Sequence, residues 1–181
     1  MINAASCRVR LLTADDILAI TAAFAALGWD KPHAQYEGYL AEQRHGEREV
    51  LVAWQGGMFV GYVTVVWHSA YAPFRATGIP EIADFNVLPR FRRQGIGSLL
   101  LDEAERRSAE RSQVAGIGVG MTADYGAAQR LYVKRGYLPD GRGIVARGRH
   151  VTWGKRSSST MSWPCISRRC CELTCAPAAG K

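Results

Sequence analysis

Residues 84–101 read Asp84-Phe-Asn-Val-Leu-Pro-Arg-Phe-Arg-Arg-Gln-Gly-Ile-Gly-Ser-Leu-Leu-Leu101. The pattern predicts a short extended run, a basic turn that contains two glycines, and then an amphipathic helix with apolar residues at helical spacing. The first turn of a helix has four backbone N–H groups without partners inside the helix, and the helix dipole adds partial positive charge there. The stretch therefore predicts a binding site for an anion such as a pyrophosphate.

The side chains of this turn support the same interpretation. Gly95 and Gly97 leave room for a ligand to approach the backbone closely. The side chains that can pair with phosphate oxygens are Arg90, Arg92 and Arg93. The sequence has no Gly-x-x-x-x-Gly-Lys-Ser/Thr motif, and Leu100 stands where a dinucleotide-binding fingerprint has its third glycine. The common nucleotide-binding folds are therefore disfavoured.

The spacing Arg92-x-x-Gly95-x-Gly97, placed after a strand that leads to Pro89, resembles the phosphate turn of the GNAT superfamily of acetyl-CoA-dependent N-acetyltransferases. The later stretch of residues 124–143 resembles a bacterial branch of the same superfamily. In that family the turn holds the pyrophosphate of coenzyme A. The residues that the resemblance implies for this contact are Arg92, Arg93, Gln94, Gly95, Ile96, Gly97 and Ser98. The cosubstrate implied by the resemblance is acetyl-CoA.

A second block, Ala128-x-x-Leu131-Tyr132-x-x-x-Gly136-Tyr137, is similar to the other signature of the family, a helix followed by glycine and an aromatic residue. The same residues also fit an ordinary amphipathic helix that ends at Gly136. The family usually has Asn three residues before the alanine, where this chain has Tyr125. The resemblance implies that Tyr125 and Ala128 lie at the coenzyme, and it extends over about residues 7–153.

The order of predicted elements indicates an α/β fold, a single domain with a mixed central sheet flanked by helices. The predicted strands are 8–12, 49–54, 58–67, 81–87 and 114–121, and the predicted helices are 17–27, 32–45, 98–112 and a helix in the second block. The GNAT resemblance implies that the strand before the phosphate turn and the strand after its helix splay apart to hold acetyl-CoA. Backbone contacts to its pantetheine arm are expected near Phe85 and Val87.

Two glycine patterns have structural interpretations. Gly56-Gly57 between two apolar runs predicts the turn of a β-hairpin. The alternation Gly116-x-Gly118-x-Gly120 predicts one strand face that a neighbouring element approaches closely, and we prefer this to a nucleotide-binding loop.

Acetyl transfer to an amine by direct attack needs a neutral amine, stabilised charge on the thioester oxygen and a proton for the departing thiolate. The resemblance implies Tyr132 as the acid, because the matching Tyr has that role in several family members; the alternative is that Tyr132 only packs beneath coenzyme A. Glu81 lies six residues before Val87, where some histone-acetylating relatives carry a catalytic Glu. A solvated carboxylate at the strand end fits Glu81 equally well, and Asp84, acting through water, is a second candidate base.

The amine acceptor is expected to meet the two N-terminal helices and their connection. An aromatic and acidic wall suited to a cationic amine is one interpretation of Trp29, Asp30, Tyr36 and Glu37, and ordinary helix-surface positions are the other. The acceptor class is a small molecule or a protein with a primary amine. A different function class, an acyl-CoA-binding module with weak catalysis, fits the replacement at Tyr125.

Composition bounds these interpretations. A chain of 181 residues that is 48% hydrophobic can bury one substantial core. No apolar run reaches the length of a membrane span, and the start Met-Ile-Asn-Ala-Ala-Ser-Cys lacks the apolar stretch of a signal peptide. We therefore expect a cytoplasmic protein without a membrane partner.

The net charge of +7 gives little support to specific nucleic-acid binding. Much of the excess lies after residue 153, where the charged side chains are Lys155, Arg156, Arg168, Arg169, Lys181 and a single acidic Glu172. The segment lacks the repeated basic and aromatic residues of a dedicated binding face, so only non-specific attraction is expected.

Four of the five cysteines also lie after residue 153, at positions 165, 170, 171 and 175. Their spacing is not a paired metal-ligand pattern, so no metal is expected. Disulfides between them are not expected either, because a reducing cytosol disfavours them. Residues 155–171 show neither strand alternation nor a helical pattern. We therefore divide the chain into an N-acetyltransferase domain, 1–153, and an atypical basic, Cys-rich tail, 154–181, expected to be poorly ordered.

A shifted reading frame would explain this tail. The genetic code permits a choice of codons for residues 157–172 whose shifted frame, which begins at the third base of each codon, is also open. That frame encodes Val-Val-Asp-Asp-Glu-Leu-Ala-Leu-Tyr-Leu-Thr-Lys-Met-Leu and then a stop. That sequence would supply a polar turn and a terminal strand. We hypothesise a frameshift at about Gly154, which would leave the sheet with an exposed edge and favour association, so a homodimer stays open.

Overall fold

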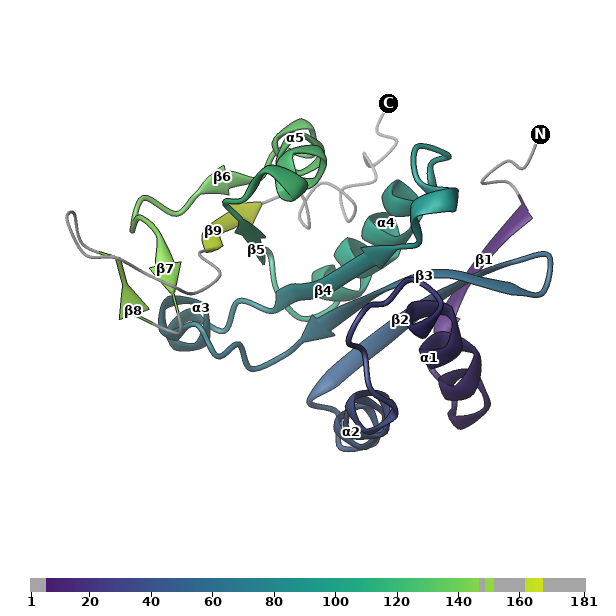
Figure 1. Cartoon of the computed structure of the whole chain (residues 1–181). Helices are drawn as coiled ribbons and strands as arrows, with labels where there is room; N and C mark the ends of the chain where they lie inside the picture. The colour runs from purple at the N-terminus through teal and green to yellow at the C-terminus, as the bar shows by residue number, and fades with distance from the viewer. Residues whose placement is uncertain (1–5, 147–148, 152–161, 168–181) are drawn as a thin grey trace, which may run out of the picture. The chain divides into compact units, whose positions relative to one another are not determined.

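The computed structural model describes residues 6–146, 149–151 and 162–167 (Figure 1). The chain falls into two compact units: Met1–Trp67 with Ala83–Ala104, and His68–Ile82 with Glu105–Lys181. Strand β4 (Glu81–Val87) and helix α4 (Ile96–Ala109) each contribute residues to both units.

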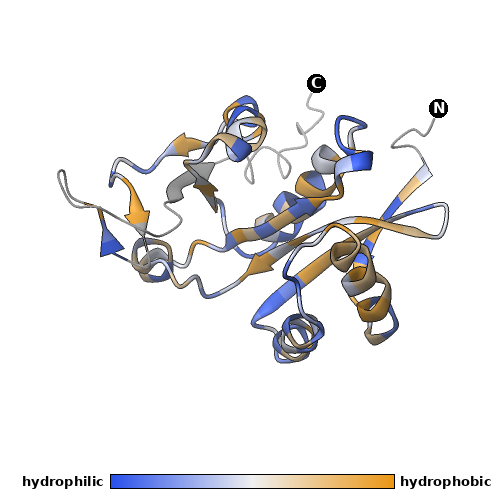
Figure 2. Ribbon diagram, in the orientation of Figure 1, coloured by the Kyte–Doolittle hydropathy of each residue, from blue (hydrophilic) through white to orange (hydrophobic). Residues whose placement is uncertain are grey.

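The first unit is built on antiparallel strands. Its elements are β1 (Cys7–Leu11), α1 (Ile17–Ala25), α2 (His33–Arg44), β2 (Arg48–Gln55), β3 (Met58–Val66), the later part of β4 and the beginning of α4. Strand β2 pairs with β1 on one side and with β3 on the other, and β4 follows β3 in the sheet. Helix α1 is among the most hydrophobic elements (Figure 2), and its buried side chains are Ile17, Ile20 and Phe24.

The hairpin prediction is confirmed. Gly56 and Gly57, at φ 55° and 78°, join β2 to β3. Both residues have the positive φ that the commonest two-residue hairpin turn requires, and glycine adopts it without steric cost. The pairing of β2 with β3 shifts register between Ala53, which lies opposite Gly61, and the next residue, Trp54.

The second unit contains the rest of β4 and α4 and the elements α3 (Ala72–Thr77), β5 (Ala115–Gly120), α5 (Gly126–Lys134), β6 (Leu138–Pro139), β7 (Val145–Ala146), β8 (Arg149–His150) and β9 (Ser162–Ser167). Strands β4 and β5 are parallel and pair only at Glu81 with Gly116 and at Ile82 with Ile117. On its other side β5 pairs with β9 in antiparallel register.

The interpretation of the alternating glycines is confirmed at Gly116 and Gly120, whereas a Cβ on Gly118 would meet only ordinary contact, 3.7 Å from Glu81 Oε1. A Cβ on Gly116 would lie 2.3 Å from an atom of the Phe74 ring, and a Cβ on Gly120 would lie 2.5 Å from the Tyr125 ring. Both distances are far below van der Waals contact, so aromatic rings occupy the space that side chains on this strand face would need.

The predicted α/β order is confirmed for the main helices and strands, whereas α3 and β6 to β9 were not predicted. The expectation that the segment after residue 153 forms no strand is wrong for Ser162–Ser167, which pairs with β5 along its whole length. The other residues of the predicted tail, 154–161 and 168–181, lie outside the described residues. The domain boundary at 153 and the frameshift stay predictions, which the nucleotide sequence of the gene tests.

Among the helices of the described ranges, none is long and apolar enough to cross a membrane.

Candidate active site

The predicted phosphate turn lies in the first unit, between β4 and α4. It begins with a short 3-10 turn, Pro89–Phe91, and the buried side chains of Phe91 and Ile96 anchor its two ends. Arg93 and Gly95 both have positive φ, 58° and 85°. Left-handed residues next to ordinary ones direct successive N–H groups toward one side of the backbone, which is the geometry of an anion-binding nest.

The first helical hydrogen bond after this turn runs from the Leu99 N–H to the Gly95 carbonyl, at 3.0 Å. By helix geometry the N–H groups of Ile96, Gly97 and Ser98 precede the ladder and have no partner inside the helix. The turn thus presents backbone donors together with the partial positive charge of the helix end, and these donors fit a pyrophosphate.

The arginines complete the donor set. Arg92 donates from Nε to the Val87 carbonyl at 3.0 Å, and its guanidinium lies over the Trp29 ring. Gln94 donates to the Arg90 carbonyl at 3.0 Å and so closes the turn from within. The side chains of Arg90, Arg92 and Arg93 are exposed, which leaves their cationic groups accessible to an anionic ligand.

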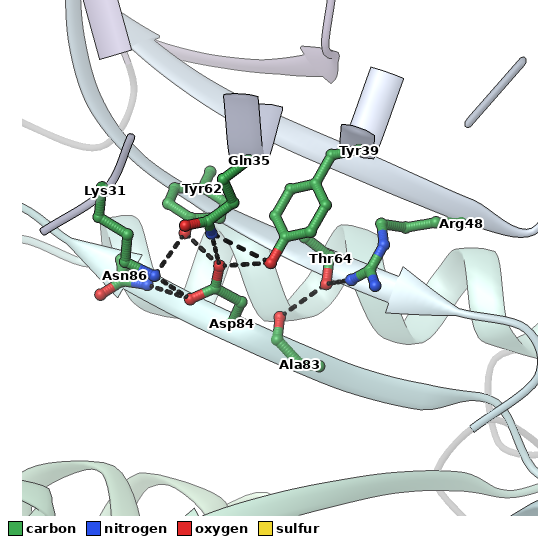
Figure 3. A network of polar contacts seen from close by, with 9 residues as sticks. All are labelled: Lys31, Gln35, Tyr39, Arg48, Tyr62, Thr64, Ala83, Asp84 and Asn86. Atoms are coloured by element: carbon green, nitrogen blue, oxygen red, sulfur yellow. Dashed lines mark hydrogen bonds and ion pairs between the residues drawn. The ribbon is translucent and has the colours of Figure 1, made fainter. Parts of the chain in front are cut away.

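A second polar cluster surrounds Asp84 on β4, in the same unit (Figure 3). Five side-chain donors reach its carboxylate. Lys31 Nζ lies 2.6 Å and Asn86 Nδ2 2.9 Å from Oδ1. Gln35 Nε2 and the Tyr39 hydroxyl each lie 2.9 Å from Oδ2, which also accepts a hydrogen bond from the Tyr62 hydroxyl. Lys31 comes from the connection between α1 and α2, the other donors from α2, β3 and β4.

These contacts determine the charge state of the cluster. Burial alone would raise the pKa of the Asp84 carboxyl, but hydrogen bonds from Lys31, Tyr62 and Tyr39 and the charge of Lys31 hold that pKa below its ordinary value. Burial and the nearby carboxylate raise the pKa of Tyr39 to about 12. Asp84 is therefore an anion at neutral pH and the Tyr39 phenol is neutral. A carboxylate with a lowered pKa is a weak base.

The backbone of β4 is irregular at this point. Asp84 has φ 46°, a left-handed conformation that costs a residue with a side chain free energy and that clusters at functional sites. Thr64 Oγ1 donates to the Ala83 carbonyl at 3.0 Å, and Arg48 donates to the Thr64 hydroxyl at 2.9 Å. A Cβ on Gly61 would lie 2.6 Å from the Asn86 carbonyl oxygen, so β3 approaches β4 here at a glycine.

Tyr132 lies on α5 in the second unit. Its side chain is 5% exposed, and its ring centroid is 5.9 Å from that of Tyr137. Gly136, at φ 84°, ends the helix as predicted, and the Tyr137 N–H donates to the Tyr132 carbonyl at 3.0 Å. These contacts fix the end of α5 on which the Tyr132 phenol is carried.

A buried ion pair holds α5 to α4 within the same unit. Arg135 Nη2 lies 2.7 Å from Glu105 Oε2, and the two side chains are 9% and 3% exposed. A pair with two parallel N–H···O bonds is geometrically specific, and losing one partner would leave a buried charge uncompensated. The orientation of α5, and with it of Tyr132, therefore depends on this pair.

Tyr125 is exposed and covers Gly120, and Gln129 donates to the Gly120 carbonyl at 2.8 Å. Ala128 is half-buried on α5. Glu81 is half-buried in the second unit, where it accepts a hydrogen bond from the hydroxyl of the buried Ser69. The predicted site residues are thus divided between the two units. The second unit contains Tyr125, Ala128, Tyr132 and Glu81, and the first contains the phosphate turn, Asp84, Phe85 and Val87.

Sequence reasoning missed most of the Asp84 cluster. Lys31, Gln35, Tyr39 and Tyr62 were not singled out, although Gln35 and Tyr39 are four residues apart on α2 and so share one helix face. Tyr36, predicted as part of an acceptor wall, is fully buried. Trp29 instead stacks on Phe24, with ring centroids 5.6 Å apart.

Residues 15–137 match the model of the acetyltransferase (GNAT) family. The chain belongs to the GNAT family. It is therefore an acetyltransferase, and the donor used by this family is acetyl-CoA. A search of curated proteins gave no significant match.

Solved GNAT structures share the fold. An acetyltransferase of the GNAT family from Streptococcus pneumoniae is 19% identical, with a TM-score of 0.62, over 89% of this chain and 98% of that chain. YncA from Salmonella typhimurium, solved with its cofactor acetyl-CoA, is 19% identical, with a TM-score of 0.65, over 97% and 98%. A ribosomal-protein-alanine N-acetyltransferase from Brucella melitensis is 20% identical, with a TM-score of 0.66, over 88% and 98%.

Proposed function

We propose that the protein transfers the acetyl group of acetyl-CoA to a primary amine of a small molecule or a protein by direct attack in a ternary complex. The observation that carries the proposal is the phosphate turn, in which left-handed Arg93 and Gly95 precede the N–H groups at the start of α4 that lie before the first helical hydrogen bond. Such a turn holds the pyrophosphate of the donor and leaves the acetyl end for reaction elsewhere.

Phe85 and Val87 are the proposed backbone contacts for the pantetheine arm, and Tyr125 and Ala128 the proposed contacts from the second signature. The limited pairing of β4 with β5 supports the first pair, because strand pairing stops before these residues. The exposed position of Tyr125 supports the second, since its ring is accessible to a ligand.

Two proton transfers accompany direct attack: one proton leaves the amine and one goes to the departing thiolate. We assign the second to Tyr132, whose phenol is a suitable donor to a thiolate and is held on α5 by neighbouring packing. For the first, Glu81 is the preferred base. Asp84 is the weaker candidate because its lowered pKa reduces its basicity.

The alternative is an acyl-CoA-binding module with weak catalysis, favoured by Tyr125 at the position where the family usually has Asn. Calorimetric titration with acetyl-CoA, followed by detection of coenzyme A release with a panel of primary amines, separates the two. Binding with amine-dependent release supports the transferase. Binding without release from any amine supports the module, and absence of binding contradicts both.

A cytoplasmic location and a homodimer stay predictions from the sequence. The oligomeric state is tested by light scattering on the full chain.

A further inference from the structure

The Asp84 carboxylate accepts hydrogen bonds from five side-chain donors. Four of them are neutral groups of regular elements: Gln35 and Tyr39 from α2, Tyr62 from β3 and Asn86 from β4. A carboxylate accepts about four hydrogen bonds. Three of the neutral donors reach Oδ2 and Asn86 reaches Oδ1, so each oxygen keeps at least one neutral donor without Lys31. The anion is therefore oriented and hydrogen-bonded independently of Lys31.

Lys31 differs from the other donors in its origin. It lies in the connection of residues 26–32, between α1 and α2, outside any helix or strand. Its ammonium donates to Asp84 at 2.6 Å and to the Tyr62 hydroxyl at 3.1 Å, and lies 5.8 Å from the centre of the Tyr62 ring. Among the five described donors to Asp84, Lys31 is thus the one cation, held by a long flexible side chain, and the nearby Arg48 guanidinium lies over the Tyr39 ring instead.

The surroundings suit a cation. The Tyr62 ring packs edge-on against the Tyr36 ring, with centroids 5.6 Å apart, and Tyr36 packs in the same way against Tyr39, at 6.0 Å. Aromatic rings beside a carboxylate attract an ammonium both through the π-system and through the charge. The side chains of Lys31 and Asp84 are 20% and 19% exposed, so the site can be reached from solvent.

We propose that Asp84 and Tyr62 form a binding site for a primary ammonium group, which Lys31 occupies until the ammonium of the acceptor displaces it. The proposal rests on the proposed function, whose acceptor it describes as an alkylammonium: a primary amine on an aliphatic chain that is charged when it binds. Asp84 acts in it as a binding group, and the acceptor passes its proton to another group before it attacks.

The conventional interpretation is a structural ion pair that only fixes the connection between α1 and α2. The two interpretations differ when the Lys31 charge is removed. A structural pair predicts a loosened connection and no new affinity. An occupied site predicts a vacant, preformed ammonium site, because the four neutral donors keep the carboxylate in place.

The test is calorimetric titration of the full-length protein with n-butylammonium chloride, without acetyl-CoA. Lys31→Met keeps the apolar stem and removes the charge, and we expect it to bind n-butylammonium at least tenfold more tightly than the unmodified protein. Lys134→Met removes an exposed lysine from α5 and is the matched control, expected to leave the affinity unchanged. Equal affinity of the Lys31→Met variant and the unmodified protein would overturn the proposal.

A second variant locates the bound cation. Adding Asp84→Asn to Lys31→Met should abolish the gained affinity, and undiminished affinity there would also overturn the proposal. If the double variant does not fold, as judged by circular dichroism, Tyr62→Phe in the Lys31→Met background replaces it, with a weakening of several-fold expected and no change contradicting the site. Amine-dependent release of coenzyme A with no ammonium binding by Lys31→Met would reject this site and leave the transferase function standing.

Discussion

The guanidinium of Arg92 lies over the indole ring of Trp29, with Cζ 5.8 Å from the ring centroid. Arg92 belongs to the phosphate turn, and Trp29 belongs to the connection between α1 and α2 that also carries Lys31. Because Arg92 Nε is bonded to the Val87 carbonyl, the two Nη groups remain for phosphate oxygens. The packing on Trp29 therefore orients a side chain that we propose binds the donor.

Replacing Arg92 should weaken donor binding. We expect Arg92→Ala to reduce the affinity for coenzyme A about tenfold or more, since hydrogen bonds to charged groups contribute about 1.5–3 kcal/mol. Trp29→Ala should have a smaller effect, about two- to fivefold, because an exposed cation–π contact is worth about 0.5–1 kcal/mol. Calorimetry measures both, with Arg44→Ala on α2 as the control. Unchanged affinity of Arg92→Ala would contradict the assignment of the turn.

Removing the Tyr132 hydroxyl should slow turnover without weakening donor binding. If Tyr132 protonates the thiolate, Tyr132→Phe should lower kcat by about a hundredfold, the range of general acid catalysis, at unchanged affinity for acetyl-CoA. Tyr137→Phe is the matched control, because it removes a hydroxyl from the neighbouring buried ring. An equal decrease in kcat for Tyr132→Phe and Tyr137→Phe would indicate that the two hydroxyls only support the structure.

Adding a methyl group at Gly61 should destabilise the first unit. A Cβ there would lie 2.6 Å from the Asn86 carbonyl oxygen and 3.1 Å from Val87 Cα, both backbone atoms that cannot rotate away. We expect Gly61→Ala to lower the free energy of unfolding by about 1–3 kcal/mol, the usual cost of overpacking. Gly38→Ala on α2 meets nothing within 4 Å and should stabilise by about 0.5–1 kcal/mol. Chemical denaturation measures both, and equal effects would contradict the close approach of β3 and β4.

The lowered pKa of Asp84 gives a pH dependence of defined sign. A carboxyl whose pKa is lower in the folded than in the unfolded state stabilises the fold above the unfolded value of about 3.8, and this contribution is lost as the pH falls through the folded pKa. Asp84→Asn should therefore lower Tm most above about pH 4, with the difference narrowing in more acidic solution. Thermal melts from pH 7 to pH 2 test this. A difference that widens on acidification would contradict the lowered pKa.

The sequence predicted the main elements because their signals are local. Gly56-Gly57 set a hairpin, Pro32 preceded α2, and Gly136 ended α5. The phosphate turn was also predictable, since its glycines, arginines and following helix are adjacent in the chain. Each of these features depends on residues within a few positions of one another.

The Asp84 cluster was not predictable in the same way. Lys31 and Asp84 are 53 residues apart, and the left-handed φ of Asp84 has no glycine to signal it. The ion pair of Glu105 with Arg135 joins two helices across 30 residues. These contacts depend on tertiary packing, to which the periodicity of a single segment is insensitive. The short helix α3 was missed because it has only six residues and so shows no periodic pattern.

Strand β9 pairs with β5 over six residues and is also the strand to which β6 and β7 bond. A premature stop before Ser162 would thus remove the hydrogen-bonding partner of three strands at once. The ladder is made by main-chain atoms, which every codon supplies in the same form, apart from the missing N–H of Pro164. This position in the fold can therefore tolerate an altered reading frame, whereas the phosphate turn, which needs Gly95 at positive φ and arginines at fixed positions, has no such freedom.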